Sequence, residues 1–261
     1  MGDFFDLLKG VQGSKIGGFN IPSLPKEFIL KSVSDSNINP HIVTHFHPKS
    51  PISEQYLRLR ENIKKLSKRN QLKVVAITSS IMGEGKTITS LNLAIAMAKD
   101  VDCKKILLVD CDLRRGSIDA SLDLRSKVGL SEYLLIGADV DNIIYRTKID
   151  KLSIIPRGKI VDNPVELLAS GKMGILLASL KEKFDYVILD TPPVVPIADA
   201  GIVCSLADGV VMVVRAGRTQ RNLVKHATEL LAQAHANMLG YILTHVEYHM
   251  PEYYYKYVSV Y

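Results

Sequence analysis

The chain has 261 residues, of which 47% are hydrophobic and 23% are charged, and its formal net charge is +6. This length and composition are those of a soluble globular protein with one α/β domain, and no apolar run approaches the roughly 18 residues that a membrane-spanning helix needs. Three cysteines (Cys103, Cys111 and Cys204) lie far apart in the sequence. This spacing excludes a dense disulfide framework and favours a reducing compartment.

The first 50 residues contain many turn-forming residues and few periodic apolar segments. We interpret residues 1–50 as a poorly packed arm that lies over the main domain or a partner. The stretch has no basic region followed by a long apolar run, so we expect no signal peptide. Asp6 stands where an N-myristoylation pattern needs Ser or Thr, so we expect no lipid anchor there.

A helix is predicted from Ser53 to Ile63. Ser53 is a good N-cap residue, and Tyr56, Leu59 and Ile63 follow at helical spacing. The opposite face of this helix is charged. Two interpretations stay open at this point: an ordinary amphipathic surface helix, or a helix that contacts another copy of the chain.

The segment from Lys73 to Thr87 reads KVVAITSSIMGEGKT. The apolar run and the Gly-Lys-Thr that follows it predict a buried strand, a phosphate-binding loop (P-loop) and a helix that begins at about Lys86. In such loops backbone N–H groups point at anionic oxygens, a lysine neutralises the β- and γ-phosphates, and a hydroxyl binds Mg²⁺. Ser80 stands where the strict pattern has glycine. The residues expected to bind a nucleotide are Gly83, Glu84, Gly85, Lys86, Thr87 and Ile88.

Apolar runs of strand length alternate with helical segments through the rest of the chain. The predicted strands are residues 105–110, 152–155, 186–190, 209–215 and 238–243, and the predicted helices are residues 89–99, 129–136, 140–146, 163–168, 173–183 and 219–236. This alternation predicts a P-loop NTPase-like α/β fold, with a parallel β-sheet covered by helices on both faces.

Acidic residues stand at the ends of two of these strands. Asp110 and Asp190 are the last strand residues, and Asp112 follows Asp110 by two positions. Because ligands of such sheets lie at the carboxyl ends of the strands, we expect the acids and the P-loop to meet there. Thr87 would bind Mg²⁺ directly and Asp190 through water. Asp110 and Asp112 are the candidates for a base that accepts a proton from an attacking hydroxyl.

The C-terminal end of the chain is rich in tyrosine. Of the 11 tyrosines, six are Tyr248, Tyr253, Tyr254, Tyr255, Tyr257 and Tyr261. The sequence there has no 3.6-residue apolar stripe, which argues against a helix. In isolation this pattern is typical of an aromatic strand or an adhesive tail. Beside a Mg²⁺-ATP site, the same phenols become phosphoryl acceptors.

With these motifs together, the chain resembles the bacterial tyrosine kinases (BY-kinases) that govern capsule and exopolysaccharide export. Residues 77–87 match their Walker A motif, residues 106–115 match their Walker A′ motif, and residues 187–193 match Walker B. The tyrosine tail also stands in its expected place. The resemblance covers the chain from about residue 51 to the C-terminus, and this set of motifs is far more specific than any one of them.

The resemblance implies three parts: an N-terminal arm (1–50), a kinase domain (51–246) related in fold to MinD and ParA, and a tyrosine-rich tail (247–261). It implies a protein-tyrosine kinase that uses ATP and Mg²⁺. The tail of one subunit would be phosphorylated in trans by its neighbour in a homo-oligomer such as a ring, and this cycle would regulate polysaccharide polymerisation and export.

The resemblance also implies roles for individual residues and for partners. Lys86 and Thr87 would bind the phosphates and Mg²⁺, Asp112 and Asp190 would hold the metal, and Asp110 or Asp112 would assist the attacking phenol. The implied partners are a separate membrane activator (a polysaccharide co-polymerase) and a cognate tyrosine phosphatase. We expect no nucleic-acid partner, because the net charge is not accompanied by a basic motif interleaved with aromatic residues. The implied location is cytoplasmic, peripheral at the inner face of the cell membrane.

The chain departs from the family pattern at two places. Met82 stands where the family's Walker A motif commonly has proline. The ring-forming helix of the family reads E-x-x-R-x-x-R, and here Glu54 and Arg60 fit, but Leu57 takes the place of the first arginine and Arg58 is one residue late. On a helix this shift turns the side chain by about 100°. We therefore expect Glu54, Arg58 and Arg60 to be the oligomer contacts, in an altered form.

Two other functions stay open. A MinD- or ParA-type ATPase switch would carry a signature lysine at position 81, where this chain has Ile81, and would not need the tyrosine tail. A non-catalytic scaffold of polysaccharide export could use the same site to bind ATP only for assembly.

Overall fold

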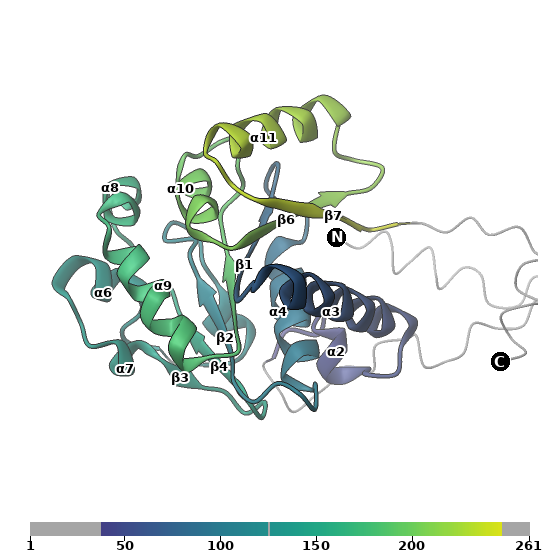
Figure 1. Ribbon diagram of the computed structural model, residues 1–261, viewed down its shortest axis with the longest axis horizontal. Helices are drawn as coiled ribbons and strands as arrows, with labels where there is room; N and C mark the ends of the chain where they lie inside the picture. The colour runs from purple at the N-terminus through teal and green to yellow at the C-terminus, as the bar shows by residue number, and fades with distance from the viewer. Residues whose placement is uncertain (1–37, 125, 247–261) are drawn as a thin grey trace, which may run out of the picture. The chain divides into compact units, whose positions relative to one another are not determined.

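A seven-stranded sheet forms the centre of the computed structural model, which describes residues 38–124 and 126–246 (Figure 1). The strand order is β3-β4-β2-β5-β1-β6-β7, and all neighbouring strands run parallel except β3 and β4. The strands are β1 (Val74–Ser79), β2 (Ile106–Asp110), β3 (Tyr145–Arg146), β4 (Leu152–Ile155), β5 (Tyr186–Asp190), β6 (Gly209–Arg215) and β7 (Met238–Thr244).

Helices cover both faces of this sheet. The helices are α2 (Val43–Phe46), α3 (Pro51–Asn70), α4 (Lys86–Ala98), α5 (Ile118–Ser121), α6 (Leu130–Ile136), α7 (Val140–Ile143), α8 (Pro164–Ala169), α9 (Lys172–Lys183), α10 (Asp199–Leu206) and α11 (Arg221–Gln233). In Figure 1, α2, α3 and α4 lie together on one side of the sheet, and α6, α8, α9 and α10 lie on the other. The predicted α/β fold class is confirmed.

The central strand shows why these apolar runs become strands. All six residues of β1 are buried, and successive residues point to opposite faces of the sheet. Val74 and Ala76 join the core under α9, α10 and α11, whereas Val75 and Ile77 join the core under α4. A strand buried on both faces is apolar without alternation, as the sequence indicated.

Most predicted elements agree with the structure to within two or three residues, but the helices predicted at residues 53–63 and 140–146 do not, since the first continues to Asn70. Residues 140–146 were expected to be one helix, but they form the short helix α7 and the edge strand β3, which pairs antiparallel with β4. The helices α2, α5 and α10 were not predicted. The helix predicted from Ser53 begins two residues earlier, at Pro51, because the Ser50 side chain accepts a hydrogen bond from the Ser53 N–H and caps it.

The segment formed by residues 38–50 packs on α4, although we assigned these residues to a poorly packed arm. Ile42 is fully buried there. The Asn92 side chain of α4 accepts hydrogen bonds from both the N–H and the hydroxyl of Thr44, at 2.9 Å each, and donates to the carbonyl of His41 at 3.1 Å. The division at residue 50 stays a prediction for the arm as a whole, since residues 1–37 lie outside the described part.

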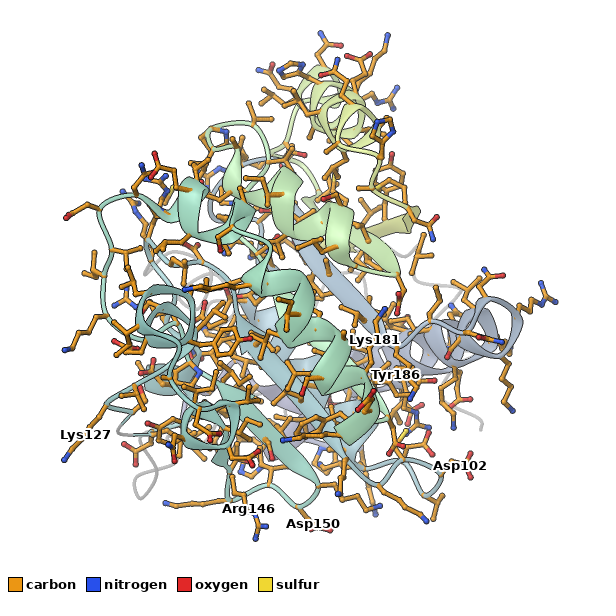
Figure 2. All side chains as sticks on the ribbon, turned by 60° about the vertical axis from the view of Figure 1, so that its left-hand side comes forward. Asp102, Lys127, Arg146, Asp150, Lys181 and Tyr186 are labelled. Atoms are coloured by element: carbon orange, nitrogen blue, oxygen red, sulfur yellow. The ribbon has the colours of Figure 1, made fainter. Side chains whose placement is uncertain are left out.

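The edge of the sheet that holds the N-terminal ends of the parallel strands is rich in charged side chains. Figure 2 shows Asp150 at the bottom of the molecule and Asp102 at its lower right, just before β4 and β2 respectively. Lys181, also labelled there, donates a 2.6 Å hydrogen bond to Asp208, which precedes β6. The opposite edge, where the strands end, holds the candidate site. None of the helices in residues 38–124 and 126–246 is long and apolar enough to cross a membrane.

Candidate functional site

The P-loop joins the end of β1 to the first turn of α4. Gly83 and Gly85 have φ angles of +80° and +92°, a left-handed conformation that glycine adopts without strain. Gly85 is the N-cap residue of α4, so Lys86 and Thr87 form its first turn. Free N–H groups and the positive end of the helix dipole are found together at such a terminus, which makes it favourable for an anion.

The two unusual residues of the loop are Ser80, which is buried against β6, and Met82, which is exposed. Ser80 is fully buried, and its hydroxyl donates to the sulfur of Met212 on β6 at 3.6 Å. It does not have a positive φ angle, so the glycine of the strict pattern is not required there. Met82 is 52% exposed, and the Arg115 guanidinium lies 3.5 Å from its sulfur. Neither departure removes a residue that could contact phosphate.

The three predicted acids and the P-loop lie together, because β2, β5 and β1 are neighbours in the sheet. Asp110 is paired with Asp190 across β2 and β5 in the strand register. Thr87 Oγ1 donates to Asp190 Oδ2 at 2.7 Å, and Lys86 Nζ lies 3.4 Å from Asp112 Oδ2. The expected convergence at the carboxyl edge therefore occurs.

Asp190 is held by hydroxyl groups of α4. Its other carboxylate oxygen accepts a 3.0 Å hydrogen bond from Ser90, and the residue is 1% exposed. Sequence reasoning missed Ser90, although a signal was present: it follows Thr87 by three residues and so shares a helix face with it. Two hydroxyl donors fix the orientation of the Asp190 carboxylate toward the P-loop.

Asp110 is fully buried and bonded to backbone. Its two oxygens accept hydrogen bonds at 3.2 Å from the N–H groups of Asp112 and Ile118. A side chain at Gly116 would lie 2.3 Å from the Asp110 carboxylate, so only glycine fits beside it. Asp112 is 5% exposed and lies closer to Lys86 Nζ. The geometry therefore favours Asp112 over Asp110 as the group that a substrate hydroxyl can reach.

Burial and mutual repulsion change the ionisation of these groups. Burial, together with the neighbouring Asp190 carboxylate, raises the pKa of Asp110 to about 8. Burial also raises the pKa of Asp190, against the opposing effects of Lys86 and the two hydroxyl donors. At Lys86, burial disfavours the charged ammonium, but the three carboxylates outweigh it and raise its pKa above the ordinary value. The site thus holds a permanent cation beside closely spaced acids.

The donor set fits a hard divalent cation that is completed by phosphate oxygens. The Thr87 hydroxyl and the Asp112 and Asp190 carboxylates are all oxygen donors at one edge of the sheet, as Mg²⁺ prefers. Within the described residues, no group of three or more His, Cys, Asp or Glu side chains could hold a metal by itself. Phosphate oxygens of a bound nucleotide would complete the oxygen donor set of Thr87, Asp112 and Asp190.

Two of the predicted nucleotide-binding residues have other contacts. The Glu84 side chain is 1% exposed and turns toward the end of β6, so its contact with a nucleotide would have to use the backbone N–H. The Ile88 carbonyl accepts a 2.9 Å hydrogen bond from Asn92 within α4. The binding roles of both residues stay predictions.

The predicted oligomer contacts on α3 differ in exposure. Glu54 and Arg58 are exposed, as an intermolecular contact would require. Arg60 instead turns toward its own chain: its guanidinium lies 3.2 Å from the Ala96 carbonyl at the end of α4 and 3.2 Å from the Asp100 carboxylate. Only Glu54 and Arg58 are therefore presented to a second copy without breaking internal bonds. The six predicted acceptor tyrosines lie outside the described residues.

Comparisons with known proteins agree with this site. A family model described as an AAA domain matches residues 72–238. The chain is 36% identical over 214 residues to the tyrosine-protein kinase YwqD of Bacillus subtilis (strain 168), covering 82% of this chain and 90% of that protein. It is 38% identical over 196 residues to the tyrosine-protein kinase CpsD of Streptococcus agalactiae, covering 74% and 84%.

Solved structures point the same way. The kinase domain of the Escherichia coli tyrosine kinase ETK superposes with a TM-score of 0.74 at 29% identity, covering 80% of this chain and 84% of that one. The septum site-determining protein MinD of Pyrococcus horikoshii OT3, solved with Mg-ADP, shares the fold with a TM-score of 0.58 at 24% identity, covering 71% and 76%. The alternative of a MinD-like switch is therefore not favoured, and the chain belongs to the family of bacterial tyrosine-protein kinases.

Proposed function

We propose that this chain is an ATP-dependent protein-tyrosine kinase whose acceptors are the tyrosines of its own C-terminal tail. The observation that supports this most is the meeting of Lys86, Thr87, Asp112 and Asp190 at the ends of three neighbouring strands. A P-loop alone serves many nucleotide-dependent functions. The additional acid, Asp112, beside the lysine is what a transfer reaction to a hydroxyl needs.

Binding of the nucleotide would use the beginning of α4. The N–H groups of the glycine-rich turn would contact the β-phosphate, and the Lys86 ammonium would neutralise the β- and γ-phosphates. Mg²⁺, when bound, would neutralise the charge that develops between the β- and γ-oxygens. Thr87 would ligate it directly, and the Asp112 and Asp190 carboxylates would orient its water ligands.

The transfer step would begin with attack of a tyrosine oxygen on the γ-phosphorus. A new O–P bond forms, the bond between the γ-phosphorus and the β–γ bridging oxygen breaks, and ADP leaves. Asp112 would take the phenolic proton, since its carboxylate is less enclosed than that of Asp110. Because the transition state is loose, holding the phenol in line contributes more than the strength of the base.

The arrangement of subunits and partners is also part of the proposal. We place the tail of one subunit in the site of another, within a homo-oligomer such as a ring that uses the exposed Glu54 and Arg58 of α3. A membrane activator protein would hold the kinase at the inner face of the cell membrane, and a cognate phosphatase would reverse the reaction. Cycling between the two states would regulate capsule or exopolysaccharide polymerisation and export. The kinase relatives support the reaction.

The test is intact-mass analysis of the purified chain with and without Mg²⁺-ATP, followed by mapping of the tail peptides. We expect mass increases of whole phosphate groups on tail tyrosines in the wild type. Lys86→Met, which removes the phosphate-neutralising cation, should abolish them. A wild-type chain that hydrolyses ATP and leaves every tail tyrosine unmodified would refute the kinase proposal in favour of a switch or scaffold.

A further inference from the structure

Glu84 is the acidic residue of the phosphate-binding loop, and its side chain is buried. The neighbouring Met82 and Gly83 are exposed, but the Glu84 side chain is 1% exposed. Its carboxylate accepts hydrogen bonds from the Ile81 N–H at 2.8 Å and the Thr219 hydroxyl at 2.5 Å, and a longer one from the Arg215 N–H at 3.3 Å. Because a buried carboxylate is costly without donors, this arrangement fixes the side chain in one place.

These bonds connect the loop to a different part of the sheet. Ile81 belongs to the loop itself, whereas Arg215 is the last residue of β6 and Thr219 lies in the turn before α11. The carboxylate therefore bridges the P-loop and the end of β6. Charge-assisted hydrogen bonds of this kind are about twice as strong as neutral ones.

A second connection runs from the loop to β7. The hydroxyl of Thr244, the last residue of that strand, donates to the Glu84 carbonyl at 2.7 Å and lies 3.5 Å from the Val214 carbonyl. The Thr244 methyl group would lie 3.5 Å from a Cβ at Gly85, so it packs against the N-cap residue of α4. Both the side chain and the backbone of Glu84 are thus held from outside the loop.

We propose that Glu84, Thr219 and Thr244, which we call the loop brace, are positioning residues for nucleotide binding in this kinase. The inference rests on the proposed function, because it concerns the same phosphate site. The brace holds the backbone between Ile81 and Gly85 in the conformation whose N–H groups contact the phosphates. An unbraced loop with two left-handed glycines would have to be ordered by the nucleotide at each binding event, which weakens affinity.

The test compares matched threonine variants of the full-length chain. Thr244→Val and Thr219→Val each remove one hydroxyl from the brace and keep the shape of the side chain. Thr228→Val is the control, since its hydroxyl bonds to Val224 and Tyr241 on the α11 side of β7, away from the loop. For each variant we would measure the dissociation constant of Mg²⁺-ATP, KM and kcat for phosphotyrosine formation, and the thermal midpoint.

We expect each brace variant to bind Mg²⁺-ATP about 3- to 10-fold more weakly, the effect of one lost hydrogen bond, with kcat at saturating ATP within about twofold of wild type. Thr244→Ser, which keeps the hydroxyl, should restore the affinity. Thermal midpoints of the Thr→Val variants should match that of Thr228→Val.

The inference is overturned if Thr244→Val and Thr219→Val bind ATP as tightly as Thr228→Val. It is also overturned if Thr244→Ser binds no better than Thr244→Val, or if the loss of affinity follows the thermal midpoint across all variants. A wild type that binds Mg²⁺-ATP but forms no phosphotyrosine would instead refute the proposed kinase function, and the affinity comparison would still decide on the brace. A wild type that binds no nucleotide would overturn both.

Discussion

Asp110 and Asp112 stand two positions apart, but their surroundings give them different capabilities. Asp110 is enclosed and bonded to two backbone N–H groups, and its pKa is raised to about 8, first by burial and then by Asp190. Asp112 lies nearer to Lys86 and keeps a small exposed area. The first is therefore suited to holding the turn after β2 in place, and the second to meeting a substrate.

We expect Asp112→Asn to lower kcat for phosphotyrosine formation by about 100-fold or more, because the phenol loses its proton acceptor. The measurement is initial-rate kinetics at saturating Mg²⁺-ATP. Asp162→Asn, at an exposed position, removes the same charge from the same protein and should leave kcat within about twofold of wild type. Equal rates for the two variants would rule out a direct role for Asp112.

Single residues also show where sequence reasoning succeeded. Asp110 and Asp190 could be placed together, because parallel strands end at one edge of a sheet. The orientation of Arg60 could not be predicted. It depends on a carbonyl and a carboxylate that lie 36 and 40 positions further along the chain, where no local pattern reports them. The contact of Ser80 with Met212, which explains why serine is tolerated in the loop, likewise could not be predicted from the local sequence.

The junction between α3 and α4 is held by a cluster of charges. The Asp100 carboxylate, just after α4, lies 2.6 Å from Lys64 Nζ and 3.2 Å from Arg60 Nε, and it also accepts a 2.8 Å hydrogen bond from the Asp102 N–H. Burial raises the pKa of Asp100, but Lys64, the Asp102 N–H and Arg60 outweigh burial and hold it below its ordinary value. The cluster fixes the end of the helix that carries Lys86.

We expect Asp100→Asn to lower the free energy of unfolding at pH 7 by about 1–3 kcal/mol. The pKa of Asp100 is lower in the folded chain than in the unfolded chain, so its contribution is complete above about pH 4 and is lost as the pH falls through the folded value. The difference between wild type and variant should therefore shrink below about pH 4 in urea unfolding curves.

Asp102→Asn is the matched control for that comparison. The Asp102 carboxylate also contacts Lys64, at 3.0 Å, but its side chain is 77% exposed. An exposed ion pair of this kind contributes little, so this variant should stay within about 0.5 kcal/mol of wild type. A pH-independent effect of Asp100→Asn would mean that shape, rather than charge, stabilises the junction.

Elements with a clear apolar pattern could be predicted from the sequence, and elements without one could not. Buried strands and the helix after the P-loop have unambiguous apolar patterns. Two-residue β3 exists only because it pairs with β4, and four-residue α5 is little more than one helical turn, too short to show a repeating apolar stripe. Residues 38–50 have no periodic apolar pattern, so the sequence did not predict their packing. That packing depends on hydrogen bonds to Asn92 of α4, which lies 48 positions after Thr44 in the chain.

For the whole molecule, the proposed reaction requires two copies of the chain. A direct test mixes a full-length Lys86→Met chain, which keeps its tail, with a full-length chain whose six tail tyrosines are replaced by phenylalanine. The first chain has acceptor tyrosines but no working P-loop. The second chain has a working P-loop but no acceptor tyrosines in its tail. We expect phosphotyrosine on the Lys86→Met tail only in the mixture, as measured by tail peptide mapping.

Each chain alone serves as the control and should remain unmodified. If the mixture also stays unmodified while wild type is phosphorylated, the transfer takes place within one chain, and the proposed exchange of tails between subunits is wrong. Dilution of the wild type separates the same alternatives, since an intermolecular reaction slows with dilution and an intramolecular reaction does not.

The contact between residues 38–50 and α4 has a practical consequence. A shortened protein that starts at Pro51 would lose Ile42 and would leave the Asn92 amide with one of its four hydrogen bonds, the one to Ile88. Apolar side chains of α4, the helix that carries Lys86, would then be exposed to solvent. We expect this shortened protein to aggregate. Its low activity would then result from the truncation and not from the catalytic site.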